Sequence, residues 1–234
     1  CSRNRGPMPE DTLRGIYREI FSGALALEKP LAVAFLGPAA TFTHQAALAR
    51  FGTSVNYVPQ PTIADVFEAV TRAQADYGVV PVENSTEGAV THTLDMFADA
   101  AVKICAEINV AVHHHLMGRC RREELRVLYS HPQVFGQCRR WLHRHLPNVP
   151  LVEVASTTEA TSRCAAEPYA GALASALAAQ RYGLKILAEN TEDFSDNITR
   201  FLVLGREPAK ASGDDKTSLL FVVRDRVGAL YDSL

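Results

Sequence analysis

Short apolar runs alternate with amphipathic segments along most of this chain. Apolar residues recur at helical spacing between Asp11 and Leu27, and Lys29-Pro30 then ends that segment. The strands expected after it are 31–36, 54–58, 77–82, 125–129, 151–155, 171–175 and 185–188. The helices expected between them are 41–50, 63–73, 133–146, 157–166 and 176–181. Such alternation predicts parallel sheets joined by crossover helices, and therefore an α/β fold.

Local signals support these elements and their grouping. Gly52 stands where a helix C-cap glycine belongs, and Thr62 with Asp65 matches a capping box. The alternation comes in two groups, which predicts two small α/β lobes. We expect the chain to leave the first lobe along 103–113 and to return along 186–190, so that the first lobe is discontinuous in sequence.

The last part of the chain has a different character. Residues 207–215 are polar and rich in helix breakers, and we interpret them as a linker. The pattern of 216–223 predicts a further strand, and a helix is expected to begin at Val227. One strand and part of one helix cannot form a core by themselves, because too little apolar surface is buried.

The composition is that of an ordinary globular protein. Of 234 residues, 47% are hydrophobic, and 24 lysines and arginines face 26 acidic residues. Without a basic excess, neither a nucleic acid nor a membrane surface is an expected partner. No apolar run approaches the roughly 18 residues of a spanning helix, and the first residues lack a secretory segment. The cytoplasm is the expected location, and a leader removed from a longer chain stays an open alternative.

Cysteine and histidine patterns do not indicate a metal site. The cysteines are odd in number and contain no Cys-x-x-Cys pair, so free thiols are expected. His113, His114 and His115 are adjacent, but neighbouring residues of a strand point to opposite faces. Since no cysteine or acidic spacing completes a ligand set, we expect no metal.

Chemistry is concentrated in short polar segments at the ends of apolar runs. Residues 197–201, Asn-Ile-Thr-Arg-Phe, place an amide, a hydroxyl and a cation at one strand entrance. The other segments are Gly37-Pro38-Ala39-Ala40-Thr41-Phe42-Thr43, Pro81-Val82-Glu83-Asn84-Ser85-Thr86-Glu87-Gly88 and Ser130-His131-Pro132-Gln133. In α/β sheets, strand carboxyl ends meet helix amino ends, where free N–H groups favour anions. The pattern therefore indicates a site for an anionic substrate.

In their order and spacing, these motifs closely resemble the prephenate dehydratase family over residues 31–206. The resemblance implies a fold similar to type II periplasmic binding proteins, with a cleft between lobes. Lobe 1 would comprise 31–108 and 189–206, and lobe 2 would comprise 109–188. The implied reaction converts prephenate to phenylpyruvate, carbon dioxide and water without a cofactor. Two alternatives stay open, namely the same chemistry on arogenate and a non-catalytic anion sensor of the same fold.

The resemblance also implies roles for individual residues. Thr199 would donate a hydrogen bond to the departing hydroxyl, and Arg200 would pair with a carboxylate. Glu83 and Glu87 are candidate acids if burial raises their pKa. His131 is expected to contact substrate or, preferably, to brace its loop. The residues expected to bind substrate are Gly37, Pro38, Thr41, Phe42, Asn84, Ser85, Glu87, Gly88, Ser130, His131, Gln133, Ser156, Thr157, Asn197 and Phe201.

For several of these residues a structural role is an equal alternative. Glu83 and Glu87 would cap a helix that begins near Thr86. Ser156 and Thr157 would cap the helix that follows them. The sequence alone leaves these alternatives open.

One position departs from the family pattern Gly-Pro-x-Gly-Thr-Phe-Ser, because Ala40 stands in place of the second glycine. If that position needs a positive φ, alanine costs about 1 kcal/mol there. If glycine only permits close approach, the methyl group narrows access to the site. Thr43 retains the hydroxyl of the usual serine, so we expect activity to survive.

The flanking segments have their own resemblances. Residues 1–30 are similar to the last helix and linker of a chorismate mutase domain, and one such helix cannot assemble a mutase site. Residues 216–234 are similar to the start of an ACT regulatory domain, in which Gly228, Ala229 and Leu230 match an effector motif. Phenylalanine would then be a feedback effector of the full-length protein only. By the same resemblance, a homodimer or higher homo-oligomer is expected.

Overall fold

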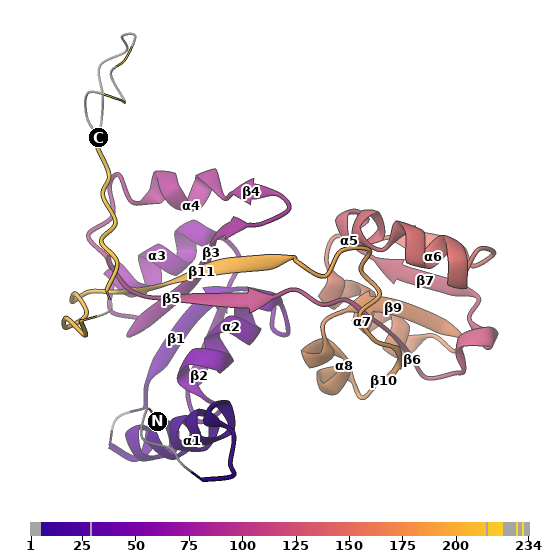
Figure 1. The fold of residues 1–234 in the computed structure, drawn as a ribbon, viewed down its shortest axis with the longest axis horizontal. Helices are drawn as coiled ribbons and strands as arrows, with labels where there is room; N and C mark the ends of the chain where they lie inside the picture. Colours follow the sequence, from indigo (N-terminus) through magenta and orange to yellow (C-terminus); the bar gives the residue numbers. More distant parts are fainter. Residues whose placement is uncertain (1–5, 29, 214, 222–227, 229–230, 232–234) are drawn as a thin grey trace.

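The computed structural model describes residues 6–28, 30–213, 215–221, 228 and 231. These residues form two α/β lobes, each built on one sheet, and two extended segments join the lobes (Figure 1). The predicted α/β class is confirmed. Among the described residues, no helix is long and apolar enough to cross a membrane.

The first lobe is built on a mixed sheet with the strand order β2-β1-β3-β11-β5. Its strands are β1 (Ala32–Leu36), β2 (Asn56–Gln60), β3 (Tyr77–Asn84), β4 (Gly88–Ala89), β5 (Lys103–Ala111) and β11 (Ile198–Gly205). β1 is parallel to β2 and β3, whereas β11 is antiparallel to β3 and β5. Because β11 comes from much later in the chain, two separate parts of the sequence assemble this lobe.

Helices cover both faces of this sheet. They are α1 (Glu10–Glu28), α2 (Phe42–Phe51), α3 (Ile63–Thr71) and α4 (Thr91–Met96), and α1 lies against α2. Phe35 and Phe201 are buried on the face that α2 covers, and Phe67 is buried on the face that α3 covers. Each such side chain contributes about 1.5–3 kcal/mol to stability through the apolar surface that it buries.

The second lobe has the strand order β10-β6-β9-β7-β8. Its strands are β6 (His115–Gly118), β7 (Val127–Ser130), β8 (Leu151–Glu153), β9 (Ala170–Ala174) and β10 (Lys185–Ala188). Its helices are η1 (Arg122–Glu124), α5 (Pro132–Gln137), α6 (Arg139–His145), α7 (Thr157–Ala166) and α8 (Ala176–Tyr182). Strand β9 is buried along its whole length and forms the centre of this lobe.

Two extended segments connect the lobes, and they run beside each other. The outgoing segment follows β5, and the returning segment, residues 189–197, leads into β11 (Figure 1). The backbone N–H of Val112 donates to Asn197 O over 2.8 Å, and that of Thr191 donates to His114 O over 2.7 Å. The return predicted along 186–190 is wrong for its first residues, because β10 pairs with β6 inside the second sheet. The returning segment therefore begins after β10, at residue 189.

Most predicted helices and strands are confirmed within two residues, but 133–146 is not one helix. It is divided at Cys138 into α5 and α6. The carboxylate of Asp193, in the returning segment, accepts from the N–H groups of Arg140 over 2.8 Å and of Trp141 over 3.0 Å. This contact stabilises a new helix start, and no local sequence pattern reveals it.

The helix expected near Thr86 begins later, at Thr91 in α4. The side chain of Asn84 explains the delay, because its Oδ1 accepts from the N–H groups of Thr86 and Glu87. These bonds hold the segment in a turn, after which β4 pairs with β3. Glu83 and Glu87 therefore do not cap a helix at this position.

The strand predicted over 216–223 is wrong for its described part, since 215–221 form no regular element. A strand needs a neighbour to satisfy its backbone, and none pairs with these residues among those that the structure describes. Gly228 is exposed and has a φ of +80°. Ala229 and Leu230 lie outside the described residues.

Candidate active site

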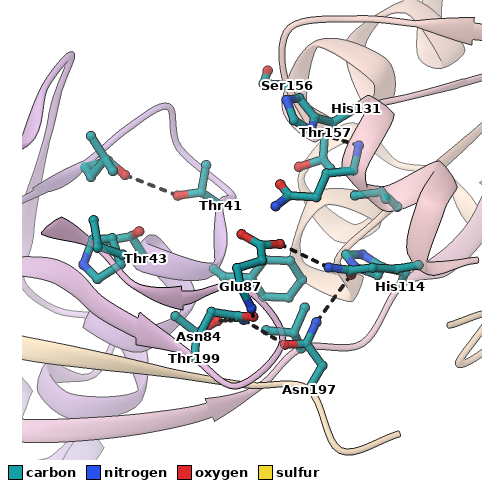
Figure 2. A pocket seen from close by; sticks show the side chains of 18 of the residues that line it. Thr41, Thr43, Asn84, Glu87, His114, His131, Ser156, Thr157, Asn197 and Thr199 are labelled. Carbon is teal, nitrogen blue, oxygen red and sulfur yellow. Dashed lines mark hydrogen bonds between the residues drawn. The ribbon is translucent and has the colours of Figure 1, made fainter. Parts of the chain in front are cut away.

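A pocket of about 470 Å³ lies between the two lobes (Figure 2). Its walls come from the first sheet, from loops and helices of the second lobe, and from both crossing segments. It is lined by Leu36, Thr41, Phe42, Thr43, Pro81, Asn84, Glu87, Val90, Val112, His114, His131, Gln133, Val134, Gln137, Ala155, Ser156, Thr157, Asn197, Thr199 and Phe201. No lysine or arginine is among these described residues, so backbone and neutral polar groups must provide any attraction for an anion.

The helix amino termini that reach the pocket include those of α2 in the first lobe and α7 in the second. Thr41 caps α2 and accepts from the N–H of His44 over 3.4 Å, while Ser156 caps α7 and accepts from the N–H of Glu159 over 3.0 Å. The first N–H groups of a helix have no partner within the helix, and the helix dipole makes this end positive. Both ends therefore suit an anionic ligand. The capping role expected as an alternative for Ser156 is confirmed, and Ser156 also lines the pocket.

A chain of side-chain hydrogen bonds forms the floor of the pocket, and its direction follows from two backbone groups. Asn84 Oδ1 accepts from the N–H groups of Thr86 (2.9 Å) and Glu87 (3.1 Å), so the amide orientation of Asn84 is fixed. Asn84 Nδ2 must then be the donor to Thr199 Oγ1 at 2.8 Å and to Asn197 Oδ1 at 2.7 Å.

The same direction continues across the pocket to the second lobe. Because Asn197 Oδ1 is an acceptor, Asn197 Nδ2 is the donor to Gln137 Oε1 at 3.3 Å. Gln137 Nε2 then donates to Glu87 Oε1 at 3.2 Å, and His114 Nε2 lies 2.8 Å from Gln137 Oε1. Figure 2 shows this chain between Asn84, Asn197 and Glu87. Each member has one arrangement that satisfies all its partners.

The hydroxyl of Thr199 is left with a proton to donate. Thr199 is 9% exposed and lines the pocket, and its oxygen already accepts from Asn84. A hydroxyl has one donor and two acceptor positions. Since Asn84 occupies an acceptor position, the O–H remains available for a ligand.

Strand alternation separates Thr199 from Arg200. Thr199 and Phe201 line the pocket, whereas Arg200 does not, because successive side chains of β11 point to opposite faces. Arg200 Nη2 lies 3.4 Å from Glu83 Oε2, and the two side chains are about half exposed, although Nε of Arg200 is buried. The structure thus pairs two of the expected catalytic residues with each other, away from the pocket.

His114 is the buried titratable group at the floor of the pocket. It is 2% exposed, and burial lowers the pKa of its imidazole, although the hydrogen bond with Gln137 and the charge of Glu192 oppose that shift. Burial also opposes ionisation of Glu192, but hydrogen bonds from His113 and from the His114 backbone lower its pKa overall. A neutral imidazole therefore lies beside an ionised carboxylate.

The structure brings most of the expected catalytic and substrate-binding residues to one place. Those that line the pocket are Thr41, Phe42, Asn84, Glu87, His131, Gln133, Ser156, Thr157, Asn197, Thr199 and Phe201. His131 also braces its loop as preferred, since its Nδ1 accepts from the N–H of Gln133 over 3.3 Å.

The other expected residues do not line this pocket. They are Gly37, Pro38, Glu83, Ser85, Gly88, Ser130 and Arg200. Ser130 is fully buried and donates to Leu173 O over 2.9 Å, so its hydroxyl serves the second sheet. Ser85 Oγ donates to Asp196 O and accepts from the N–H of Ile198, which fastens the turn after β3 to the start of β11.

Sequence reasoning missed His114 and Gln137 as pocket residues. Three adjacent histidines suggest metal ligands before they suggest a pocket residue, and Gln137 lies in the middle of a helical pattern. No local sequence signal marks Gln137, because the break at Cys138 that places its amide beside both crossing segments depends on the distant carboxylate of Asp193. The described residues contain no group of three or more His, Cys, Asp or Glu that could hold a metal ion.

Ala40 fastens the first lobe to the second. Its φ is +71°, which confirms the positive φ considered for this position. Its side chain is 1% exposed and belongs to the hydrophobic core of the second lobe. Ser175 Oγ donates to Ala40 O over 3.1 Å, and Thr158 Oγ1 donates to Ala39 O over 3.3 Å. The loop that carries the departure from the family pattern is therefore an interlobe contact.

The family model and the curated relatives agree on one family. The family model described as prephenate dehydratase matches residues 33–209. The chain is 50% identical over 230 residues to the bifunctional chorismate mutase/prephenate dehydratase of Aquifex aeolicus, covering 98% of this chain and 64% of that protein. It is 35% identical over 216 residues to the prephenate dehydratase of Bacillus subtilis, covering 85% of this chain and 75% of that protein.

A solved structure agrees with these relatives. The crystal structure of prephenate dehydratase from Arthrobacter aurescens in complex with L-Phe has a TM-score of 0.74 and 31% identity to this chain. The match covers 86% of this chain and 70% of that one. The chain described here spans 64% of the length of the bifunctional relative.

Proposed function

Since this chain belongs to the prephenate dehydratase family, we propose that its interlobe pocket binds prephenate and converts it to phenylpyruvate, carbon dioxide and water. The observation that carries this proposal is the hydroxyl of Thr199, which lines the pocket and keeps a free proton because Asn84 donates to its oxygen. That group is placed to donate a hydrogen bond to an oxygen that leaves the substrate.

The helix amino termini supply the sites for the two carboxylates of prephenate. One carboxylate lies at the start of α2, beside Thr41 and Thr43, and the other lies at the start of α7, beside Ser156 and Thr157. The unpaired N–H groups of these helix ends and the nearby hydroxyls replace the cation expected from Arg200. Because one carboxylate is bound by each lobe, the substrate is held in one orientation.

The reaction needs little more than alignment and charge stabilisation. The bond between the ring and its carboxylate breaks, its electron pair enters the ring, and the carbon–oxygen bond of the ring hydroxyl breaks as the ring becomes aromatic. Thr199 stabilises the negative charge on the departing oxygen, which takes up a proton and leaves as water. Glu83 lies outside the pocket, and Glu87 serves within it as a carboxylate that accepts from Gln137, so we assign the proton taken up by the departing oxygen to solvent.

The test is turnover of prephenate by the purified chain at pH 7.5, with phenylpyruvate measured against breakdown in buffer alone. Replacing Thr199 with valine keeps the shape but removes the hydroxyl, and we expect kcat to fall about 100-fold or more. Thr199→Ser keeps the hydroxyl and should retain most activity. Binding of prephenate without turnover would instead favour the non-catalytic sensor.

The flanking segments are assigned by analogy with the relatives. We assign α1 to the end of a chorismate mutase domain, since the Aquifex relative is named for both activities. The Arthrobacter structure holds L-Phe, and phenylalanine is accordingly proposed as the feedback effector of the full-length protein. The expected effector residues begin at Gly228, beyond the pocket-forming lobes. A homo-oligomer stays a prediction.

A further inference from the structure

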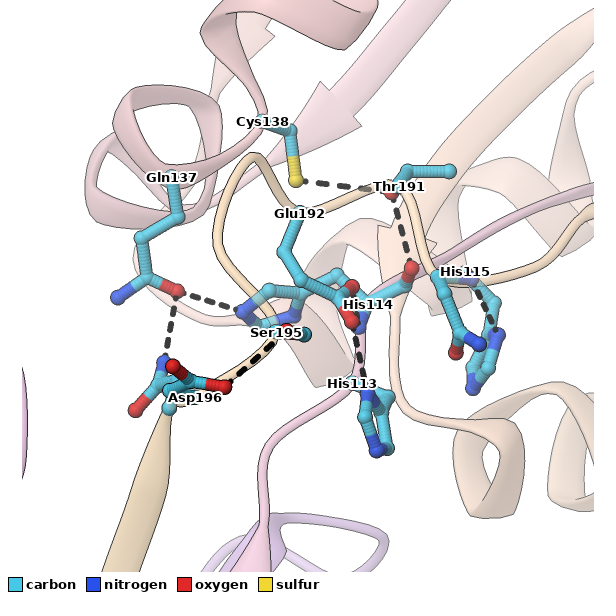
Figure 3. Close-up of polar contacts among 11 residues, drawn as sticks. His113, His114, His115, Gln137, Cys138, Thr191, Glu192, Ser195 and Asp196 are labelled. Atoms are coloured by element: carbon cyan, nitrogen blue, oxygen red, sulfur yellow. Dashed lines mark hydrogen bonds and ion pairs between the residues drawn. The ribbon is translucent and has the colours of Figure 1, made fainter.

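His114 joins the two lobes at the floor of the pocket, although it lies on neither sheet. It occupies the outgoing segment between β5 and β6, and its imidazole is buried. Its Nε2 lies 2.8 Å from Oε1 of Gln137, which belongs to α5 of the second lobe (Figure 3). The Gln137 amide in turn contacts Glu87 of the first lobe.

The hydrogen bonds select one tautomer of His114. Gln137 Oε1 accepts from Asn197, so it is the acceptor towards His114 as well, and His114 Nε2 must carry the proton. Nδ1 is buried and has no hydrogen-bond partner. A proton on Nδ1 would be a buried donor without an acceptor, which is more costly than an unused lone pair. The structure therefore favours the neutral imidazole protonated on Nε2.

The backbone of His114 is held on both sides by the returning segment. Glu192 Oε2 accepts from the His114 N–H over 2.9 Å, and Glu192 Oε1 lies 2.7 Å from His113 Nδ1. His114 O accepts from the N–H of Thr191 over 2.7 Å and from its hydroxyl over 2.9 Å. Figure 3 shows these contacts around the crossing. They leave the imidazole little freedom to turn away from Gln137.

We propose that His114 is a positioning residue, whose Nε2–H fixes the amide of Gln137 so that its NH₂ group faces Glu87 and the substrate. If the amide turned over, its NH₂ would face the donors of His114 and Asn197, and its oxygen would face the carboxylate of Glu87. Each of these contacts would be repulsive. His114 thus favours the one amide orientation that offers a donor to the reaction site. The inference rests on the proposed function.

A double-mutant cycle tests the proposal. His114→Leu removes the Nε2 donor, and we expect kcat/KM for prephenate to fall about tenfold or more. Gln137→Leu should cause a similar fall, and the double variant should fall no further than Gln137→Leu alone, because His114 acts through that amide. Losses that multiply in the double variant would overturn the proposal, as would full activity of His114→Leu.

Two further variants separate positioning from a general effect on folding. His114→Gln places an amide nitrogen near the position of Nε2 and should remain within about threefold of the unchanged chain. His115→Asn is the matched control, because His115 Nδ1 accepts from the N–H of Asn190 and does not line the pocket. Activity of that control should be unchanged. If His114→Gln lost as much activity as His114→Leu while keeping its thermal midpoint, the donor would not be the cause.

A measurement without substrate keeps the two proposals distinguishable. The ¹⁵N resonances of the His114 imidazole at pH 7.5 should show a protonated Nε2 and an unprotonated Nδ1, and Gln137→Leu should shift the Nε2 resonance. A proton on Nδ1 would overturn the inference even in an active enzyme. Absence of prephenate turnover together with the expected resonances would instead reject the proposed function and keep the positioning contact.

Discussion

Asn84 and Thr199 are direct neighbours across β3 and β11, and Asn84 Nδ2 donates to Thr199 Oγ1 over 2.8 Å although 115 residues separate them. Two backbone N–H groups of the following turn fix the amide of Asn84. The direction in which the Thr199 hydroxyl points is therefore decided by a turn in the first lobe. The turn that precedes α4 therefore contributes to the proposed chemistry, because it orients the hydroxyl of Thr199.

Asn84→Asp tests that link with almost no change in shape. A carboxylate still accepts from the turn, but it would also accept the proton of Thr199 and so turn the hydroxyl away from the substrate. We expect kcat to fall about 100-fold, the loss typical of removing one transition-state donor. Steady-state kinetics measure it. Ser85→Ala is the control, because Ser85 fastens the same turn without lining the pocket. Equal losses in both variants would assign the effect to the turn.

Arg200→Ala should have little effect on substrate affinity. Arg200 does not line the pocket and pairs with Glu83 where both side chains are about half exposed, and such an ion pair contributes about 0–1 kcal/mol to stability. We expect KM for prephenate within about threefold, with a small change in the midpoint of urea unfolding. Glu83→Ala should behave alike, since the two side chains form one pair. A rise in KM for Arg200→Ala alone would restore the carboxylate contact predicted from sequence.

The sequence predicted the strands, most helices and many pocket residues, because these depend on local signals. Thr41 and Ser156 were identifiable since a capping residue and its helix lie together in the chain. Alternation along β11 places Arg200 and Thr199 on opposite sides of the strand, so only one of these neighbours can line the pocket. That information was present in the sequence and could have corrected the catalytic assignment.

Other features were not predictable from local pattern because distant residues create them. The break between α5 and α6 depends on the carboxylate of Asp193, which the returning segment brings to the helix. Gln137 reaches the pocket only through that break, and His114 meets it only because the two lobes share a crossing. The position of Ala40 in the core of the other lobe likewise requires the tertiary fold.

Ala40→Gly should change stability by less than about 1 kcal/mol. Glycine relieves the cost of a φ of +71°, about 1 kcal/mol, but it also removes a methyl group buried in the second lobe, which contributes a similar amount. Urea unfolding measures the balance. Ala40→Val has no such compensation, because a β-branched side chain at positive φ is strained and the core has little room. We expect it to lose more than about 2 kcal/mol. A tolerated valine would show that the lobes separate readily at this loop.

The stability of the chain should decline as the pH falls below about 6.5, and His114 should account for part of the decline. Burial is the main cause that lowers the pKa of His114 below its ordinary value of 6.5. The hydrogen bond with Gln137 and the charge of Glu192 raise this pKa, whereas the neighbouring His115 and His113 lower it further. Below pH 6.5 the unfolded chain therefore binds a proton that the folded chain does not. The free energy of unfolding rises with pH wherever the unfolded state holds more protons. It therefore decreases as the pH falls below 6.5, and this decrease ends once the folded imidazole is also protonated.

A comparison of variants isolates this contribution, because His44 and His115 also have pKa values lowered by burial and titrate in the same window. Urea unfolding at pH 7.5 and pH 5.5 should show a smaller loss of unfolding free energy for His114→Gln than for the unchanged chain, because glutamine takes up no proton in this range. His143→Gln is the control, because that residue lies on the exposed side of α6. If the control reduced the decline as much as His114→Gln, general charge repulsion rather than the buried imidazole would cause the pH dependence.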